Sequence, residues 1–188
     1  MTDDVGAGHP GTVASGVERA APGDTALLLD VMLGKLATYL RMCGYDAEYA
    51  LDGGDETEDG ADGARDPRTD PGDDNLLARA DAEGRVLLTR DVRLAERAPR
   101  NVLLAEREPL AQLRELEAVG FAVSLDEEPS RCGVCNGRVE AVGRDEPVPD
   151  YAPDPGETAL WRCRDCGQVF WRGSHWRDVE TRLNGGEQ

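Results

Sequence analysis

In the first part of the chain, the spacing of apolar residues changes from a continuous run, typical of a buried strand, to the spacing of an amphipathic helix. An apolar run at residues 27–29 stops at Asp30, and apolar side chains then recur at helical spacing from Leu33 to Leu40. Gly44 is placed to end this helix, and residues 45–50 alternate well enough for a second strand. The pattern predicts a β-α-β unit with Asp30 at the carboxyl end of its first strand, the edge at which ligands collect in open parallel sheets.

The same alternation of strands and helices continues to residue 120. A helix from Asp73 to Gly84 is followed by a buried strand at 85–89, a short helix through residues 94–95, a strand at 101–104 and a helix from 109 to 120. This order predicts an α/β fold with a doubly wound parallel sheet and right-handed crossovers.

Composition divides the rest of the chain. Residues 1–24 and about 52–72 are polar segments with Gly, Pro and acidic residues and no periodicity, so we expect a disordered tail and a disordered acidic insertion. The spacing of a calcium-binding loop is absent from the insertion. Apolar periodicity fades again after Pro129, which predicts one domain over 25–129 and a small second domain over 130–188.

The chain is strongly acidic, with a formal net charge of −17 and a single lysine, Lys35, among its 21 cationic residues. Such a surface is typical of a halophilic protein in a salt-filled cytoplasm, and an acidic surface for a basic partner is the alternative. No apolar run approaches the ~20 residues of a membrane span, and residues 1–24 lack the basic start and apolar core of a signal peptide. We therefore expect a cytoplasmic protein that does not bind membranes.

Four cysteines form two C-x-x-C pairs, Cys132 with Cys135 and Cys163 with Cys166. Each pair has the spacing with which a tight turn grips one tetrahedral Zn²⁺, and two such turns make a zinc ribbon. Disulfides are the alternative in an oxidising compartment, and redox-active pairs would be expected on a thioredoxin-like strand-helix junction. With four thiolates the site would be closed, so the zinc would hold the fold and take no part in chemistry.

Aspartates fall at positions that the predicted sheet brings towards one edge. Asp30 follows the first strand, Asp91 lies two residues past the strand at 85–89, and Asp73 and Asp74 begin a helix. Converging carboxylates suit Mg²⁺ and metal-assisted hydrolysis of a phosphodiester. Each aspartate can equally be a cap or turn residue. Dinucleotide and P-loop fingerprints are absent.

Five segments in this order resemble a known family, the PIN-like RNase domain with a C-terminal zinc ribbon, or Mut-seven C-terminal RNase domain. The segments are LDVMLGKLATYLRMCGYDAEY, DDNLLARA, GRVLLTRDVRLAERA, SRCGVCNGRVE and WRCRDCGQVFWRGSHW. They cover the chain from Leu27 to about Leu183. The tail and the acidic insertion depart from the family pattern.

The resemblance implies a PIN-like fold and a ribonuclease that depends on Mg²⁺ or Mn²⁺. It assigns the metal-binding carboxylates to Asp30, Asp91 and Asp74, with Asp73 as the substitute for Asp74. RNA contacts are then expected from cationic and aromatic side chains, namely Lys35, Arg41, Arg90, Arg131, Arg172, His175 and Trp176. A non-catalytic RNA- or ribosome-associated binding module and a protein-interaction factor remain the alternatives.

Overall fold

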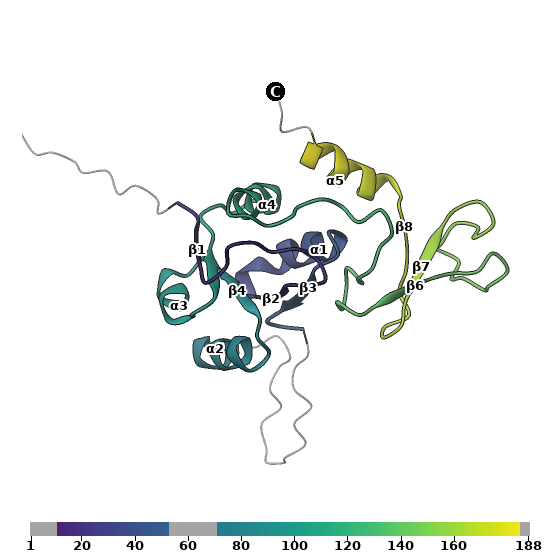
Figure 1. The fold of residues 1–188 in the computed structure, drawn as a ribbon. Coiled ribbons are helices and arrows are strands. Elements are labelled where there is room, and N and C mark those ends of the chain that lie inside the picture. The colour runs from purple at the N-terminus through teal and green to yellow at the C-terminus, as the bar shows by residue number, and fades with distance from the viewer. Residues whose placement is uncertain (1–10, 53–70, 185–188) are drawn as a thin grey trace, which may run out of the picture.

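The computed structural model describes residues 11–52 and 71–184, and its centre is a mostly parallel five-stranded sheet (Figure 1). The strand order is β1-β5-β4-β2-β3. The bounds are β1 Val13–Ser15, β2 Ala26–Leu29, β3 Asp46–Tyr49, β4 Val86–Thr89 and β5 Asn101–Leu103. Strands β2 to β5 pair in parallel, and only β1 is antiparallel. The predicted α/β fold is confirmed, and the sheet that was predicted to be parallel is mostly parallel, with β1 as the antiparallel exception.

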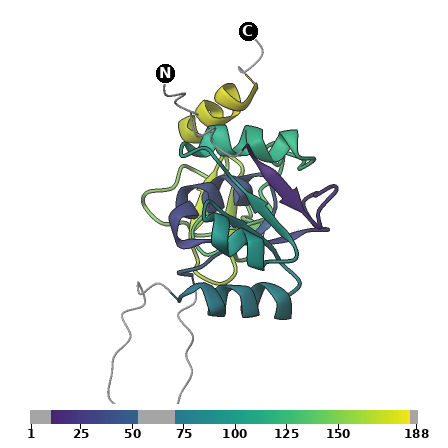
Figure 2. The same ribbon diagram turned by 90° about the vertical axis from the view of Figure 1, so that its left-hand side faces the viewer.

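Helices cover both faces of this sheet, as Figure 2 shows with α4 above and α2 below. The helices are α1 Gly34–Met42, α2 Asp73–Ala82, α3 Val92–Arg97 and α4 Pro109–Ala118, and a 3-10 turn, η1 Val31–Leu33, precedes α1. Because successive strand residues point to opposite faces, Leu27 and Leu29 pack with α1 and α4 while Leu28 packs with α2 and α3. The apolar run at 27–29 therefore belongs to a strand that is buried on both faces.

The segment before β2 is ordered from Gly11 onwards, which corrects the expectation of disorder up to residue 24. Residues 13–15 form β1 against β5, and Ala20 is buried and bridges to Phe121. Three residues of strand carry too little periodicity to be recognised from sequence. The expectations for residues 1–10 and 53–70 lie outside the described residues.

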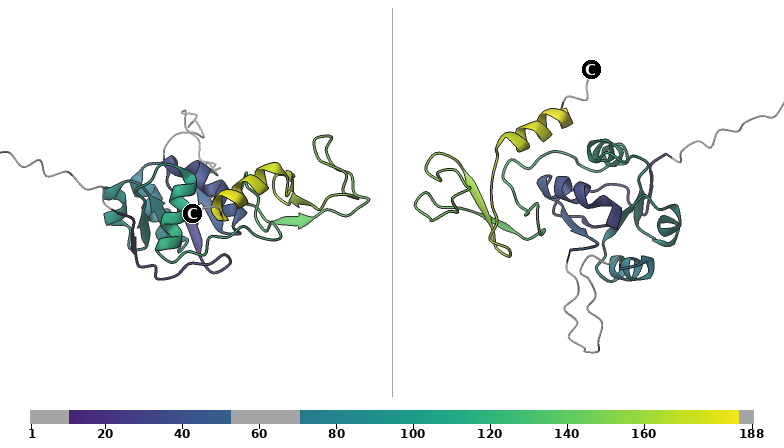
Figure 3. Two further views of the ribbon diagram at one scale, coloured as in Figure 1. Left: turned by 90° about the horizontal axis from the view of Figure 1, so that it is seen from above. Right: turned by 180° about the vertical axis from the view of Figure 1, so that it is seen from behind.

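The C-terminal part contains a second sheet and a helix that sequence reasoning did not predict. Strands β6 Val139–Ala141, β7 Leu160–Cys163 and β8 Val169–Trp171 form an antiparallel sheet that projects from one end of the α/β layers (Figure 3). Helix α5 Ser174–Asn184 then returns to the first domain, where Trp176 and Val179 pack against Met42 of α1. The C-terminal part is thus attached through a shared apolar cluster.

A buried arginine joins the two parts more directly. Arg41 of α1 is 3% exposed, and its Nε donates to Ala47 O of the edge strand β3 at 2.8 Å. Its Nη1 donates to the carbonyl oxygens of Gly133 and Val134 at 3.2 and 3.0 Å, and its Nη2 pairs with Asp52. One guanidinium therefore connects the helix, the sheet edge and the first cysteine turn.

Asp46 makes a second connection at the same edge. Asn136 donates from Nδ2 to Asp46 Oδ1 at 2.7 Å, while Arg85 and Arg131 form ion pairs with the same carboxylate at 2.9 and 3.1 Å. Burial alone would raise the pKa of Asp46, but the bonds from Arg85 and Asn136 and the charges of both arginines hold it below its ordinary value. This carboxylate stays ionised and ties the C-terminal part to β3.

Candidate metal centre and candidate active site

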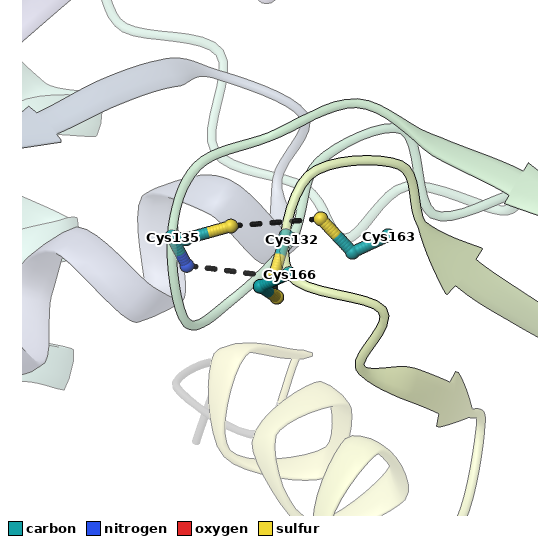
Figure 4. Close-up of side chains that lie close together, drawn as sticks. All are labelled: Cys132, Cys135, Cys163 and Cys166. Carbon is teal, nitrogen blue, oxygen red and sulfur yellow. Dashed lines mark hydrogen bonds between the residues drawn. The ribbon is translucent and has the colours of Figure 1, made fainter.

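The four predicted cysteines meet at one point (Figure 4). All four Sγ atoms lie within 4.8 Å of one another, with Cys132 to Cys166 at 3.7 Å and Cys135 to Cys163 at 3.5 Å. Sulfurs around a tetrahedral Zn²⁺, with bonds of ~2.3 Å, lie about 3.8 Å apart. No cysteine of the described residues forms a disulfide. The donor set and its spacing fit a closed four-thiolate zinc site.

Local backbone structure shapes each cysteine turn. The amides of Val134 and Cys135 donate to Cys132 Sγ, both at 3.4 Å, as thiolate ligands require. Asn136 and Gly167 directly follow the second cysteine of each pair and have positive φ angles of 65° and 74°. The sharp turn of the first pair is therefore made by Asn136, one residue before Gly137.

Gly137 is required for a different reason. A Cβ atom at this position would lie 2.3 Å from Asp165 Oδ2 and 2.9 Å from Cys163 Sγ. The missing side chain therefore lets the two cysteine turns approach each other. The side chain of Asn136 contacts the five-stranded sheet, because its Oδ1 accepts a hydrogen bond from Ala47 N of β3 at 3.1 Å.

Asp30 lies at the carboxyl end of β2 as the sequence predicts. It is 4% exposed, and its backbone N–H donates to Leu88 O at 3.0 Å, which extends the β2–β4 ladder up to the aspartate. Its Oδ1 accepts from Val31 N at 2.6 Å and its Oδ2 accepts from Thr89 Oγ1 at 2.6 Å. The carboxylate caps η1 and is fixed by hydrogen bonds at the ligand-binding edge of the sheet.

Asp91 follows the neighbouring strand β4 at the same edge and is tied to Asp30 through Thr89. The backbone N–H of Asp91 donates to Thr89 Oγ1 at 3.0 Å, and that hydroxyl donates in turn to Asp30. Asp91 Oδ1 caps α3 by accepting from Arg93 N and Leu94 N at 2.8 and 3.1 Å. Both aspartates are therefore helix caps and also lie at adjacent strand ends.

Asp73 and Asp74 lie in the first turn of α2, after Gly72 as N-cap, and both are exposed. Asp74, with a side chain that is 90% exposed, forms an ion pair with Arg97 of α3, and Asp73 lies 3.7 Å from the same guanidinium. Within the described residues, the cysteines are the only group of three or more potential ligands whose donor atoms lie this close together. Asp30, Asp91 and Asp74 are thus not gathered in one preformed cage.

Two of the expected RNA-contacting arginines also have structural partners, and their contact with RNA stays a prediction. Arg41 is buried, and its guanidinium donates hydrogen bonds to backbone carbonyl oxygens and forms an ion pair with Asp52. Arg131, with a 14% exposed side chain, donates to Asn136 O and pairs with Asp46. The periodic position of Arg41 on α1 gave no sign of this, because two of its partners, Gly133 and Val134, are 92 and 93 residues away in sequence.

The other expected contacts are more varied. Lys35 and His175 are exposed, and Arg90 is half-buried with an Nε that has no partner within the described residues. Arg172 is exposed and lies over the Trp176 ring at 5.9 Å, whereas Trp176 itself is 8% exposed and belongs to the apolar cluster with Met42. Their contact with RNA stays a prediction.

Two residues of this region were missed by sequence reasoning. Thr89 is fully buried and bridges Asp30 and Asp91. The sequence feature that could have identified it is a hydroxyl residue at the end of an otherwise apolar strand. Arg107 and Lys35 line a hollow of about 330 Å³ beside η1. No pattern in the sequence marks Arg107, because it lies in a loop.

The fold and the site together define a class of protein, an α/β domain with a mostly parallel sheet and an attached cluster of four cysteines that could hold a metal ion. The chain belongs to the Mut7-C RNAse domain family, which it matches over residues 25–183. Membership in this family indicates a ribonuclease-type function with RNA as substrate. No curated protein and no solved structure matches the chain. Of the helices in the described ranges, none has the length and apolar character to cross a membrane.

Proposed function

We propose that the chain is a metal-dependent ribonuclease with a PIN-like active site at the carboxyl edge of β2 and β4. The observation that carries this proposal is a chain of two hydrogen bonds, in which Asp91 N donates to Thr89 Oγ1 and that hydroxyl donates to Asp30 Oδ2. It holds a buried carboxylate in one orientation beside a second aspartate, where active sites of parallel sheets lie. Family membership over residues 25–183 supports hydrolysis of RNA in particular.

The residues at this edge fit Mg²⁺ or Mn²⁺ by the chemistry of their donors. Both ions take carboxylate oxygens, and Mg²⁺ usually needs only one or two protein carboxylates because it keeps waters and binds substrate phosphates. Asp30 and Asp91 would hold the ion, and Asp74 would join them when Arg97 releases it. When bound, the ion supplies an activated water and neutralises charge at the scissile phosphate.

Neighbouring groups of the protein would fix the orientation of the metal-binding carboxylate and position the RNA. Thr89 keeps Asp30 Oδ2 in place, and the amide of Val31 does the same for Oδ1. Lys35 and Arg107, which line the hollow beside η1, would attract the phosphates of the RNA backbone. The four-cysteine centre would hold Zn²⁺ for structure alone, since four thiolates leave no open position.

Asp30→Asn tests the proposed function. A metal ion contributes several kcal/mol to such reactions, so cleavage of a labelled single-stranded RNA with Mn²⁺ should fall by roughly 100- to 1,000-fold. The assay is run in molar KCl, as the acidic composition suggests, with EDTA as the metal-free arm. Asp81→Asn is the matched control, because Asp81 is exposed near the far end of α2. Undiminished cleavage by Asp30→Asn, or cleavage that persists in EDTA, would contradict the proposal.

Thr89→Val tests the bridge between the two aspartates. The exchange keeps the shape of the buried side chain but removes the hydroxyl that donates to Asp30 and accepts from Asp91. Groups that orient metal ligands typically matter by about 10- to 100-fold, so we expect a loss of that size and a higher Mn²⁺ requirement. Thr181→Val on α5, which removes an exposed hydroxyl, should change neither. An unaltered Mn²⁺ titration in Thr89→Val would rule out the orienting role.

A non-catalytic RNA-binding module is the second candidate. The observation in its favour is the pairing of Asp74 with Arg97, since this carboxylate faces a cation of its own chain. If that pair persists with RNA and Mn²⁺ present, the edge would offer fewer oxygens to a metal. Binding of RNA without any cleavage across varied sequences would favour this candidate.

A further inference from the structure

A cavity of about 700 Å³ lies between α1, the cysteine turns and the start of α5. Its volume is in the range of roughly 300–1,000 Å³ that is typical of ligand sites. Its walls come from both parts of the chain, with Gly34 and Thr38 from α1, Gly133 and Val134 from the first cysteine turn, and Ser174 from α5. The attachment of the C-terminal part therefore creates a hollow that neither part has alone.

The lining of this cavity is aromatic, with polar groups at intervals. The aromatic side chains are Tyr49, Phe170, Trp171 and Trp176, and His175 stands beside them. The indole N–H of Trp176 is buried and has no acceptor within the described residues. Aromatic walls with a few hydrogen-bonding groups are the lining with which proteins hold unpaired bases, because every base has a face that can stack.

The cavity adjoins the proposed active site. Gly34 lines both this cavity and the smaller hollow beside η1 that contains Lys35 and Arg107. Tyr49 donates from its hydroxyl to Val31 O, one residue after Asp30, at 2.7 Å. Burial raises the pKa of Tyr49, and the charges of Asp52 and Asp30 raise it further, which places both carboxylates within electrostatic reach of the ring.

Although the whole chain has a net charge of −17, the surroundings of the cavity carry less negative charge and are compatible with a nucleic acid. Asp52, the carboxylate in the lining, is paired with Arg41. The exposed His175 and Ser174, from the first turn of α5, also line the cavity, and the helix dipole makes that part of the lining more positive. Arg172 lies over the ring of Trp176 with a side chain that is 41% exposed, and its guanidinium is 3.7 Å from the carboxylate of Glu180, which offsets part of its charge.

We propose that this cavity is a subsite for one or two unpaired bases of single-stranded RNA, stacked against Trp171 and its aromatic neighbours. The inference rests on the proposed function, and it specifies the substrate as an unpaired strand that passes from the cavity over Gly34 to Asp30. A base-paired helix would not present its bases to such a hollow. The cavity thus selects single strands and leaves the choice of base largely open.

The test compares Trp171→Ala with Trp161→Ala. Trp161, in β7 of the same sheet, does not line the cavity and is the matched control. Binding of a fluorescein-labelled single-stranded RNA is measured by anisotropy without chelator and without added Mg²⁺ or Mn²⁺, in the Asp30→Asn background, so that cleavage does not interfere and the proposed zinc is retained. One stacked base corresponds to about 5- to 150-fold in affinity, and we expect a loss of that size for Trp171→Ala and less than about twofold for Trp161→Ala.

A second pair of variants avoids any dependence on the aromatic packing. His175→Glu adds a negative charge at the cavity, whereas Thr181→Glu adds one at an exposed position further along α5. The first should weaken RNA binding several-fold and the second should not. Zinc content shows that each variant is folded. A duplex RNA of the same sequence should bind equally to the wild type and Trp171→Ala.

The outcomes separate this inference from the proposed function. If the wild type cleaves RNA but Trp171→Ala and His175→Glu bind it like their controls, the subsite is wrong and the nuclease stands. If the wild type binds RNA through Trp171 but never cleaves it, the nuclease fails and the cavity remains a binding site. Equal loss in Trp171→Ala and Trp161→Ala, with zinc retained, would show a general effect of the ribbon and overturn the assignment of the cavity.

Discussion

Cys163→Ala is expected to abolish zinc binding and to unfold the C-terminal part of the chain. Cys163 is buried at the end of β7, and its Sγ lies 3.5 Å from that of Cys135. The three-stranded sheet has few buried apolar side chains of its own, so the metal supplies much of its stability. Structural zinc contributes on the order of 10 kcal/mol in small domains, and we expect a loss of several kcal/mol here.

The measurement is zinc content together with urea unfolding followed by tryptophan fluorescence. Zinc should fall from about one equivalent to none, and the unfolding midpoint should fall with it. Cys43→Ala is the matched control, because Cys43 is buried in the first core, away from the other four. A Cys163→Ala protein that kept its zinc and its midpoint would show that the four thiolates do not form a metal site.

Arg41→Met is expected to detach the C-terminal part from the α/β sheet. The variant keeps the buried apolar volume but leaves the carbonyl oxygens of Ala47, Gly133 and Val134 without their donor. A buried unsatisfied group costs about 1–3 kcal/mol, which applies to Ala47 O; the bonds to Gly133, Val134 and Asp52 are only partly buried and contribute less. We expect a total loss of roughly 3–5 kcal/mol in the free energy of unfolding.

Hydrogen exchange checks where that stability is lost. In Arg41→Met the amides of β3 and of the first cysteine turn should exchange faster than those of β4, which is central in the sheet. Lys35→Met on the same helix is the control, because Lys35 is exposed and its loss should alter stability by less than about 0.5 kcal/mol. A uniform change across the whole sheet would argue against a specific attachment.

Local pattern in the sequence was enough for the first domain. The apolar runs at 27–29 and 86–88 predict short buried strands, and both are buried in the structure; the helices between them follow the 3.6-residue period. By contrast, β1 and α5 are stabilised by contacts with distant segments. Trp176 and Val179 of α5 pack on Met42, more than 130 residues earlier, which no local pattern records.

The two candidate sites differ in the same way. Cysteine spacing predicted the four residues of the cluster, because each pair lies in one tight turn and the geometry of that turn is local. Asp30 and Asp91 were located because strand ends meet at one edge of a parallel sheet. Asp74 lies on a helix instead, and its orientation depends on Arg97, a partner that residue order alone does not reveal.

Strand β3 lies at the edge of the sheet, where a backbone would normally be open to pairing. The N–H of Ala47 is taken by Asn136 and its carbonyl oxygen by Arg41. Side chains thus occupy the positions that a strand of another molecule would need, and open sheet edges are a common cause of aggregation. The cysteine turn that carries Asn136 therefore covers the edge of the sheet. If zinc holds this turn, as we propose, a chain deprived of zinc would expose that edge to pairing with other chains.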